Sequence, residues 1–298
     1  GTQTAETRAS IAQEMTARLN DLLALANSDD GQGRYLFAGA ADAAPPFTLA
    51  ALGATYSGAG SERLVDVGPQ RSVAIGDSGD QVFQSLQTGN GTFTVAATAT
   101  NTGTVKLDNA KVFDASAWDG DTYTLSFTGG NYEVRDSSNA VVSTAAYQPG
   151  TGIRFRGVEL TLSGTPVDGD SLSIAPSQSQ DMFATVQKMA ALISANPTDP
   201  AGRAQQQTAF FGALQEVDSA MTRLTDVRAT VGHRLNAIDD ATAQIDAIDV
   251  QAQQTLSGIR DLDYAEATGR LNLQMTALQA AQQTYSRIQG LSLFDFLR

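Results

Sequence analysis

The sequence contains no cysteine and a single histidine, His233, among its 298 residues. Without cysteine the chain can form no disulfide, no thiolate nucleophile and no cysteine-ligated zinc site. A lone histidine beside Arg234 in a helical pattern is an ordinary surface or packing residue, so we do not assign it to catalysis or metal binding. We therefore expect a protein that is not an enzyme and that has no catalytic residues, no metal and no cofactor.

Positive charge is also scarce. Lysine and arginine total 19 against 32 acidic residues, which gives a formal net charge of −13, and the lysines are Lys106, Lys111 and Lys188. Such a chain cannot build the basic patch that grips phosphates, so we expect no nucleic-acid partner and no membrane partner. No apolar run approaches the roughly 18 residues that span a bilayer. The sequence opens on Gly1 and not on methionine, so we expect it to begin inside a longer protein.

The most organised part of the sequence is its last third, which holds no proline after Pro200. Apolar residues recur three or four apart from Leu214 to Leu256, which places them on one face of a long helix. The pattern is typical of a coiled-coil-like rod that needs other helices beside it. It weakens near Ser257 and Gly258, and a second helical run with glutamines on its polar side then leads to an apolar tail. We expect these last residues to meet a partner: Leu271, Met275, Leu278, Tyr285, Ile288, Leu291, Leu293, Phe294, Phe296 and Leu297.

The first part of the chain predicts a helix over about Thr7–Asn27, a short aromatic strand over Arg34–Gly39 and a break at the two prolines before Phe47. From Phe47 to about Pro176, short alternating runs and glycine-rich turns predict an antiparallel sandwich or small barrel. The expected strands are Glu62–Val67, Ser72–Ile75, Gly91–Thr98, Thr104–Leu107, Thr122–Thr128, Asn131–Arg135, Ala140–Ser143, Gly152–Arg156, Val158–Leu162 and Ser171–Ala175. A helix over about Asp181–Ala195 follows and ends at Asn196–Pro200.

These patterns predict an α+β, multi-domain fold, in which helices from both chain ends form a long coiled-coil-like rod and an antiparallel β domain is inserted between them. We expect four parts: an N-terminal helical part of the rod over 1–45, the inserted β domain over 46–177, the C-terminal helices of the rod over 178–260, and a terminal assembly helix over 261–298. The β domain should fold by itself, since it has its own alternating pattern and closely spaced turns.

Two C-terminal stretches, Val231–Asn236 and Leu256–Glu266, resemble the C-terminal signature of the flagellin superfamily. Within that superfamily, other local features resemble the hook–filament junction proteins (hook-associated protein 3, FlgL type). They are the pattern that runs from Asn27 to Gly39, the Pro-Pro-Phe triplet and the ending Leu291–Leu297. The residues that carry the first two features are Gly33, Arg34, Tyr35, Phe37, Gly39, Pro45, Pro46 and Phe47.

The resemblance implies a structural protein of the bacterial flagellum that joins hook to filament through its terminal helices. It implies export through the flagellar type III apparatus to an extracellular site. The implied partners are the hook-side junction protein, flagellin, neighbouring copies of the chain in a ring, and an export chaperone. A filament-forming flagellin is an alternative. A secreted carbohydrate-binding β module on a helical stalk is another, with Trp118 stacking on the sugar.

Two acidic patterns have competing interpretations. The Asp-Gly-Asp stretches at Asp119–Asp121 and Asp168–Asp170 could supply calcium ligands, but they lack the run of oxygens that a calcium loop needs, so we favour hairpin turns. The aspartates between Asp239 and Asp263 could pair for acid–base work, but they suit a solvated helix face better. We likewise favour Trp118, Tyr123, Phe127 and Tyr132 as core aromatics of a sheet.

Overall fold

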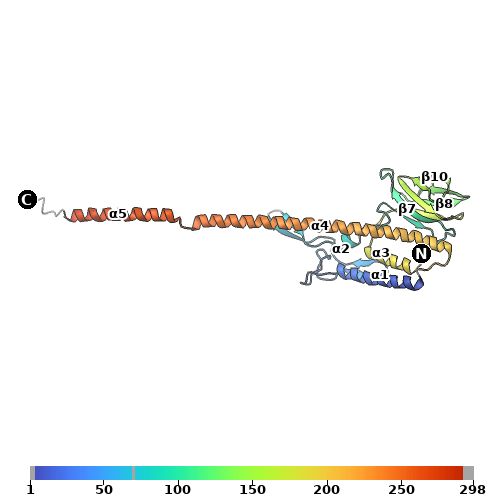
Figure 1. Ribbon diagram of the computed structural model, residues 1–298, viewed down its shortest axis with the longest axis horizontal. Helices are drawn as coiled ribbons and strands as arrows, with labels where there is room; N and C mark the ends of the chain where they lie inside the picture. Colours follow the sequence, from blue (N-terminus) through green and yellow to red (C-terminus); the bar gives the residue numbers. More distant parts are fainter. Residues whose placement is uncertain (1–3, 69–70, 291–298) are drawn as a thin grey trace, which may run out of the picture. The chain divides into compact units, whose positions relative to one another are not determined.

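The computed structural model describes residues 4–68 and 71–290. Helix α1 spans Ala5–Ala26, and the Thr4 side chain accepts a hydrogen bond from the Thr7 backbone N–H at 3.2 Å at its start. The predicted N-terminal helix is therefore confirmed within two residues. It lies beside helix α3, Met182–Ser194, whose N-cap Asp181 accepts a hydrogen bond from the Phe183 N–H at 2.6 Å (Figure 1).

The C-terminal third forms two helices, α4 over Pro200–Arg260 and α5 over Tyr264–Gly290. The predicted weakening at Ser257 and Gly258 was placed too early, because α4 continues through both and ends three residues before Asp263. Asp263 then caps α5 by accepting hydrogen bonds from the Ala265 and Glu266 N–H groups at 2.8 and 3.1 Å. The chain divides into two compact units, residues 1–238 and 239–298, and each is described by itself.

The β region contains two antiparallel sheets that share one core. The larger has five strands in the order β10-β9-β8-β13-β6, and the smaller has three in the order β11-β12-β7. Their bounds are Phe93–Ala97 (β6), Lys106–Val112 (β7), Tyr123–Thr128 (β8), Asn131–Arg135 (β9), Val141–Ala146 (β10), Gly152–Phe155 (β11), Val158–Ser163 (β12) and Ser171–Pro176 (β13). Alternate residues of both sheets face inward, as Tyr123, Leu125 and Phe127 do on β8. This confirms the predicted α+β fold and the antiparallel β region within it.

A second hydrophobic cluster joins the segment 47–87 to the helices. It includes Phe47, Phe83 and Phe183, with Leu19 from α1 and Ala220 from α4. The segment contains a two-stranded sheet of β1 (Phe47–Leu49) and β2 (Ala54–Tyr56), a hairpin of β3 (Leu64–Gly68) and β4 (Arg71–Ala74), the short helix α2 (Gly79–Phe83) and β5 (Leu86–Gln87), which pairs with β14 (Ser179–Gln180). Of these, the sequence predicted only the strands β3 and β4, as Glu62–Val67 and Ser72–Ile75.

The first residues of α4 attach to the edge of the smaller sheet. β7 is an edge strand, and its Leu107 N–H donates to the buried Thr208 hydroxyl at 3.0 Å. Gln205 donates to the Asn101 carbonyl at 2.9 Å, and Phe211 packs against the sandwich core. Helix side chains thus satisfy backbone groups that a neighbouring strand would otherwise pair.

The strand predicted over Arg34–Gly39 is wrong. Tyr35 and Ala38 form only isolated bridges, with Asp29 and Ser78. The aromatic residues that suggested a strand serve tertiary packing instead: the Phe37 ring meets Phe83 edge-on at 5.1 Å. Tertiary packing overrides the local β propensity here, because no strand among residues 4–68 and 71–290 forms a ladder with the segment.

Candidate assembly surfaces

The motif residues at 33–47 form a loop that is held by several local contacts. Arg34 pairs with Asp30 at 2.7 Å. Gly39 has φ +62°, and a Cβ at this position would lie 2.1 Å from the Ala59 carbonyl oxygen, so a larger residue cannot fit. The Tyr56 hydroxyl lies 3.1 Å from the Phe37 carbonyl and accepts the Gly79 N–H at 3.2 Å. Arg34, Phe37 and Gly39 therefore take part in contacts that shape the loop.

Asn27 holds the backbone of Phe47, the residue that follows the two prolines. Its side-chain amide accepts from the Phe47 N–H and donates to the Phe47 carbonyl, both at 2.9 Å. Ser57 fixes the second proline, since the Ser57 N–H donates to the Pro46 carbonyl at 2.8 Å. The Phe47 ring then enters the second cluster, 5.3 Å from the Phe183 ring. The triplet Pro45–Phe47 thus orients a buried anchor.

Arg234 is a structural residue to which sequence reasoning gave no role of its own. It bridges Asp77 at 2.7 Å and Glu62 at 3.1 Å, and so ties α4 to the segment around the β3–β4 hairpin. The only signal in the sequence was its place inside the Val231–Asn236 motif. Its neighbour His233 is exposed on the helix, as predicted.

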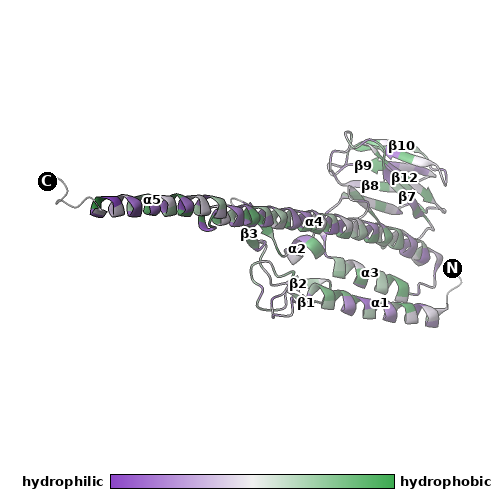
Figure 2. Cartoon of the chain, turned by 60° about the vertical axis from the view of Figure 1, so that its left-hand side comes forward, coloured by the Kyte–Doolittle hydropathy of each residue, from purple (hydrophilic) through white to green (hydrophobic). Residues whose placement is uncertain are grey.

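The apolar stripe of α4 and α5 is largely exposed. On α4 the exposed members are Leu214, Met221, Leu224, Val231, Leu235, Ile245, Ile248 and Leu256. On α5 no residue is buried, and the predicted partner residues Leu271, Met275, Leu278, Tyr285 and Ile288 are each more than half exposed. Figure 2 shows hydrophobic and hydrophilic residues interspersed along α5. Their exposure leaves the predicted contact residues of α5 accessible to a partner. The remaining predicted partner residues, Leu291, Leu293, Phe294, Phe296 and Leu297, lie outside the described residues.

The prediction that the Asp-Gly-Asp stretches are hairpin turns is wrong, because the strands that flank each stretch do not pair with one another. Asp168 and Gly169 do lie in a turn, whereas residues 119–121 lead into β8 without one. Gly120 and Gly169 have φ values of +74° and +95°, in the region that favours glycine. The buried Asp170 accepts backbone N–H groups from Thr102 and Val167, both at 2.8 Å. Its oxygens are thereby occupied in holding two loops together, and within residues 4–68 and 71–290 no cluster of acidic and histidine residues could hold a metal ion.

The aromatic residues of the β region belong to its core. Tyr123 and Phe127 are buried, while Trp118 and Tyr132 are partly buried against the same cluster. The Trp118 ring contacts Phe93 at 5.7 Å and Tyr123 at 5.8 Å. The interpretation as core aromatics is confirmed for Tyr123 and Phe127, whereas Trp118 and Tyr132 pack against the core and remain partly exposed.

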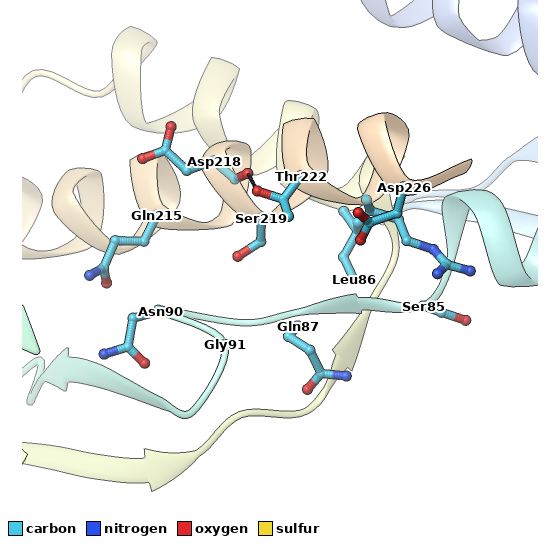
Figure 3. Close-up of a pocket in the computed structure, with 11 residues that line it drawn as sticks. Ser85, Leu86, Gln87, Asn90, Gly91, Gln215, Asp218, Ser219, Thr222 and Asp226 are labelled. Atoms are coloured by element: carbon cyan, nitrogen blue, oxygen red, sulfur yellow. Dashed lines mark hydrogen bonds between the residues drawn. The ribbon is translucent and has the colours of Figure 1, made fainter. Parts of the chain in front are cut away.

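A polar hollow lies between α4 and the loop around β5 (Figure 3). It has a volume of about 610 Å³, and its lining includes Gln87, Asn90, Asp218 and Asp226. Among the described side chains, the one buried polar atom that lacks a partner is Arg8 Nε, which lies elsewhere. The hollow thus has no buried group that awaits a ligand. None of the described helices combines the length and apolar content needed to cross a bilayer.

Two family models match the chain. The bacterial flagellin C-terminal helical region matches residues 214–297, which include the exposed stripe. The D2-like domain of flagellar hook-associated protein 1 matches residues 96–176, which include most of the sandwich. A crystal structure of Xanthomonas campestris FlgL is 36% identical in sequence, covers 86% of this chain and 84% of its own, and superposes with a TM-score of 0.80. The chain belongs to the FlgL family.

Other FlgL proteins support the same assignment. The hook-associated protein 3 of Legionella pneumophila is 32% identical with a TM-score of 0.81, and the match covers 88% of this chain and 84% of that one. Flagellar hook-associated protein 3 of Escherichia coli is 24% identical over 99% of this chain and 68% of its own length. Its Salmonella typhimurium counterpart is 40% identical over 86 residues, which are 29% of this chain and 26% of that protein. The predicted resemblance to FlgL-type proteins is confirmed.

Proposed function

We propose that this FlgL-family chain is a structural component of the bacterial flagellum that joins the hook to the filament. The observation that carries the proposal is 36% identity across most of both chains to a solved FlgL. The exposed stripe supports it, because lone amphipathic helices gain most of their stability from neighbours. The function is one of assembly and not of catalysis.

The α5 stripe is the surface that we assign to this assembly. Its polar side is rich in uncharged amides, including Gln274, Gln279, Gln282 and Gln283. Amides can hydrogen-bond across a helix interface without the cost of burying an unpaired charge. We propose neighbouring copies of the chain, the hook-side junction protein and flagellin as the partners that cover it. A site outside the cell, reached through the flagellar export apparatus, belongs to the same proposal.

Complementation tests the function. A bacterial strain that has lost its filaments through deletion of its own FlgL should regain them when it expresses a gene carrying this sequence. Leu271→Asp with Leu278→Asp should abolish the rescue, because each change puts a charge into the proposed interface. Val141→Asp, on an exposed apolar residue of the sandwich, is the matched control and should rescue normally. Normal filaments with the double α5 variant would contradict the assigned surface.

The export chaperone is proposed as the first partner of the apolar tail. Burying a phenylalanine side chain contributes about 1.5–3 kcal/mol, so Phe294→Ala with Phe296→Ala should weaken chaperone binding by about 3–6 kcal/mol. Titration calorimetry with the cognate chaperone measures this. Unchanged affinity would show that the chaperone recognises another surface.

A further inference from the structure

A groove between α1, α3 and α4 is lined by two arginines. Its volume is about 700 Å³, and we call it the arginine groove, lined by Arg8, Ile11, Ile193, Asn196, Arg203 and Phe210. No acidic residue lines it, although the chain carries a net charge of −13. Ile11, Ile193 and Phe210 give it an apolar floor. The groove therefore combines the two features that receive an acidic amphipathic segment.

Backbone carbonyls and one amide hold the two guanidinium groups. Asp199 also lies near Arg203: the Gly202 N–H, and to a lesser degree the charge of Arg203, lower the pKa of the Asp199 carboxyl. Arg203 donates to the Thr198 carbonyl at 2.8 Å, and Arg8 donates to Asn196 and to the Ala195 carbonyl at the end of α3. Arg8 Nε is buried and has no hydrogen-bond partner in the part of the chain that the structure describes. Neither arginine forms an ion pair with any described carboxylate within 4.0 Å. Both guanidinium groups are therefore fixed in position and retain N–H donors that can bind a carboxylate of a partner.

A complementary surface exists on α4 itself. Between Arg234 and Arg260 the sequence has no basic residue, and it carries Asp239, Asp240, Asp246 and Asp249. We call residues 243–252 the acidic segment. In it the exposed Ile245 and Ile248 adjoin Asp246 and Asp249. Residues three apart on a helix lie about 5–6 Å apart, so the two carboxylates form a pair on one side of the isoleucines.

We propose that the arginine groove of one copy receives the acidic segment of a second copy. Arg8 and Arg203 would pair with Asp246 and Asp249, while Ile245 and Ile248 would cover the apolar floor. This inference rests on the proposed assembly of neighbouring copies, and it names the surfaces that meet. Charge complementarity sets the orientation and selects against a groove-to-groove contact, which would oppose like charges.

The absence of cysteine permits a direct cross-linking test on the full chain. One copy carries Gln207→Cys at the exposed rim of the groove, and another carries Ala252→Cys in the acidic segment. Mixed at high concentration under mild oxidation, they should form a disulfide-linked dimer. Gln207→Cys mixed with Ala280→Cys, on α5, is the control pair and should give only background.

Charge reversal then decides whether the arginines carry the contact. Arg8→Glu with Arg203→Glu should lower the cross-linking yield about fivefold or more, because exposed pairs each contribute modestly and reversal adds repulsion. Asp246→Lys with Asp249→Lys should do the same, and combining both reversals should restore the yield. Circular dichroism melts check that every variant folds.

An unaffected yield in the reversals, or no cross-link above the control pair, would overturn the inference. Failure to regain yield in the combined reversal would also count against it. Complementation separates this outcome from the function, since filaments rescued by the Arg8→Glu, Arg203→Glu variant would refute the groove contact and leave the junction role intact.

Discussion

Replacing Phe47 with alanine tests where the folding units of this chain divide. The ring is 2% exposed and lies 5.0 Å from Tyr56, 5.4 Å from Phe83 and 5.3 Å from Phe183. Truncating a buried phenylalanine costs about 3–5 kcal/mol through lost burial and the cavity that remains. With a urea slope of about 2 kcal/mol per molar, the midpoint should fall by about 1.5–2.5 M.

Two optical probes separate the two hydrophobic clusters. Trp118 is the only tryptophan and packs against the sandwich core, so its fluorescence reports the sandwich. Helical circular dichroism reports α1, α3 and α4. We predict that Phe47→Ala shifts the helical transition and leaves the Trp118 transition in place. Leu52→Ala is the control: that side chain is 72% exposed in the same segment, and its removal should change stability by less than about 0.5 kcal/mol.

Equal shifts of both transitions in Phe47→Ala would refute this reasoning. They would mean that residues 46–177 unfold as one unit, as the sequence suggested. A shift confined to Trp118 would assign Phe47 to the sandwich, against the ring contacts that place it among the helices.

Three further predictions follow from the sandwich and its supports. Residues 92–177 expressed alone should unfold cooperatively, because they contain the whole strand set of that core; a disordered spectrum would contradict the division proposed here. Asp170→Ala should lower stability by about 1–3 kcal/mol or more by stranding buried N–H groups, while an unchanged melting temperature would show that water replaces the carboxylate. Hydrogen bonds from Lys111 and then Arg154 hold the pKa of Glu159 below its ordinary value of 4.5, so the stability that the charged carboxylate contributes is present above pH 4.5 and is lost as pH falls. In melting temperatures measured over a series of acidic pH values, Glu159→Gln should show a smaller decrease than the parent chain. An equal decrease in both would refute this prediction.

Much of this fold follows from periodicity in the sequence. Strands such as Tyr123–Thr128 and Asn131–Arg135 alternate clearly and flank a glycine turn, so their positions were predicted to the residue or nearly so. The long helix was equally plain, because no proline interrupts the run after Pro200. These signals are local, and the structure confirms them.

What could not be predicted depends on contacts that are distant in sequence. β5 and β14 are two-residue strands that exist only because they pair across more than 90 residues, and α2 is five residues long. The segment 47–87 alternates like the sandwich, and only tertiary packing assigns its Phe47 and Phe83 to the helical cluster. The Arg234 bridge likewise joins residues more than 150 positions apart.

Of the two candidate surfaces, one was predicted from the sequence and the other was not. The α5 stripe was predicted from helical spacing, and its exposure agrees with a contact role that remains a proposal. The arginine groove was not predicted, since Arg8 and Arg203 come together only through the packing of α1, α3 and α4. Sequence spacing identifies a face of one helix, but it cannot identify a site assembled from several.

Immunogold electron microscopy of complemented flagella tests the central claim most directly. An epitope placed in the exposed Asp136–Asn139 turn of the sandwich marks the chain without disturbing either hydrophobic cluster. The junction assignment predicts gold confined to the boundary between hook and filament. Label distributed along the whole filament would contradict it and would identify the chain as a filament subunit.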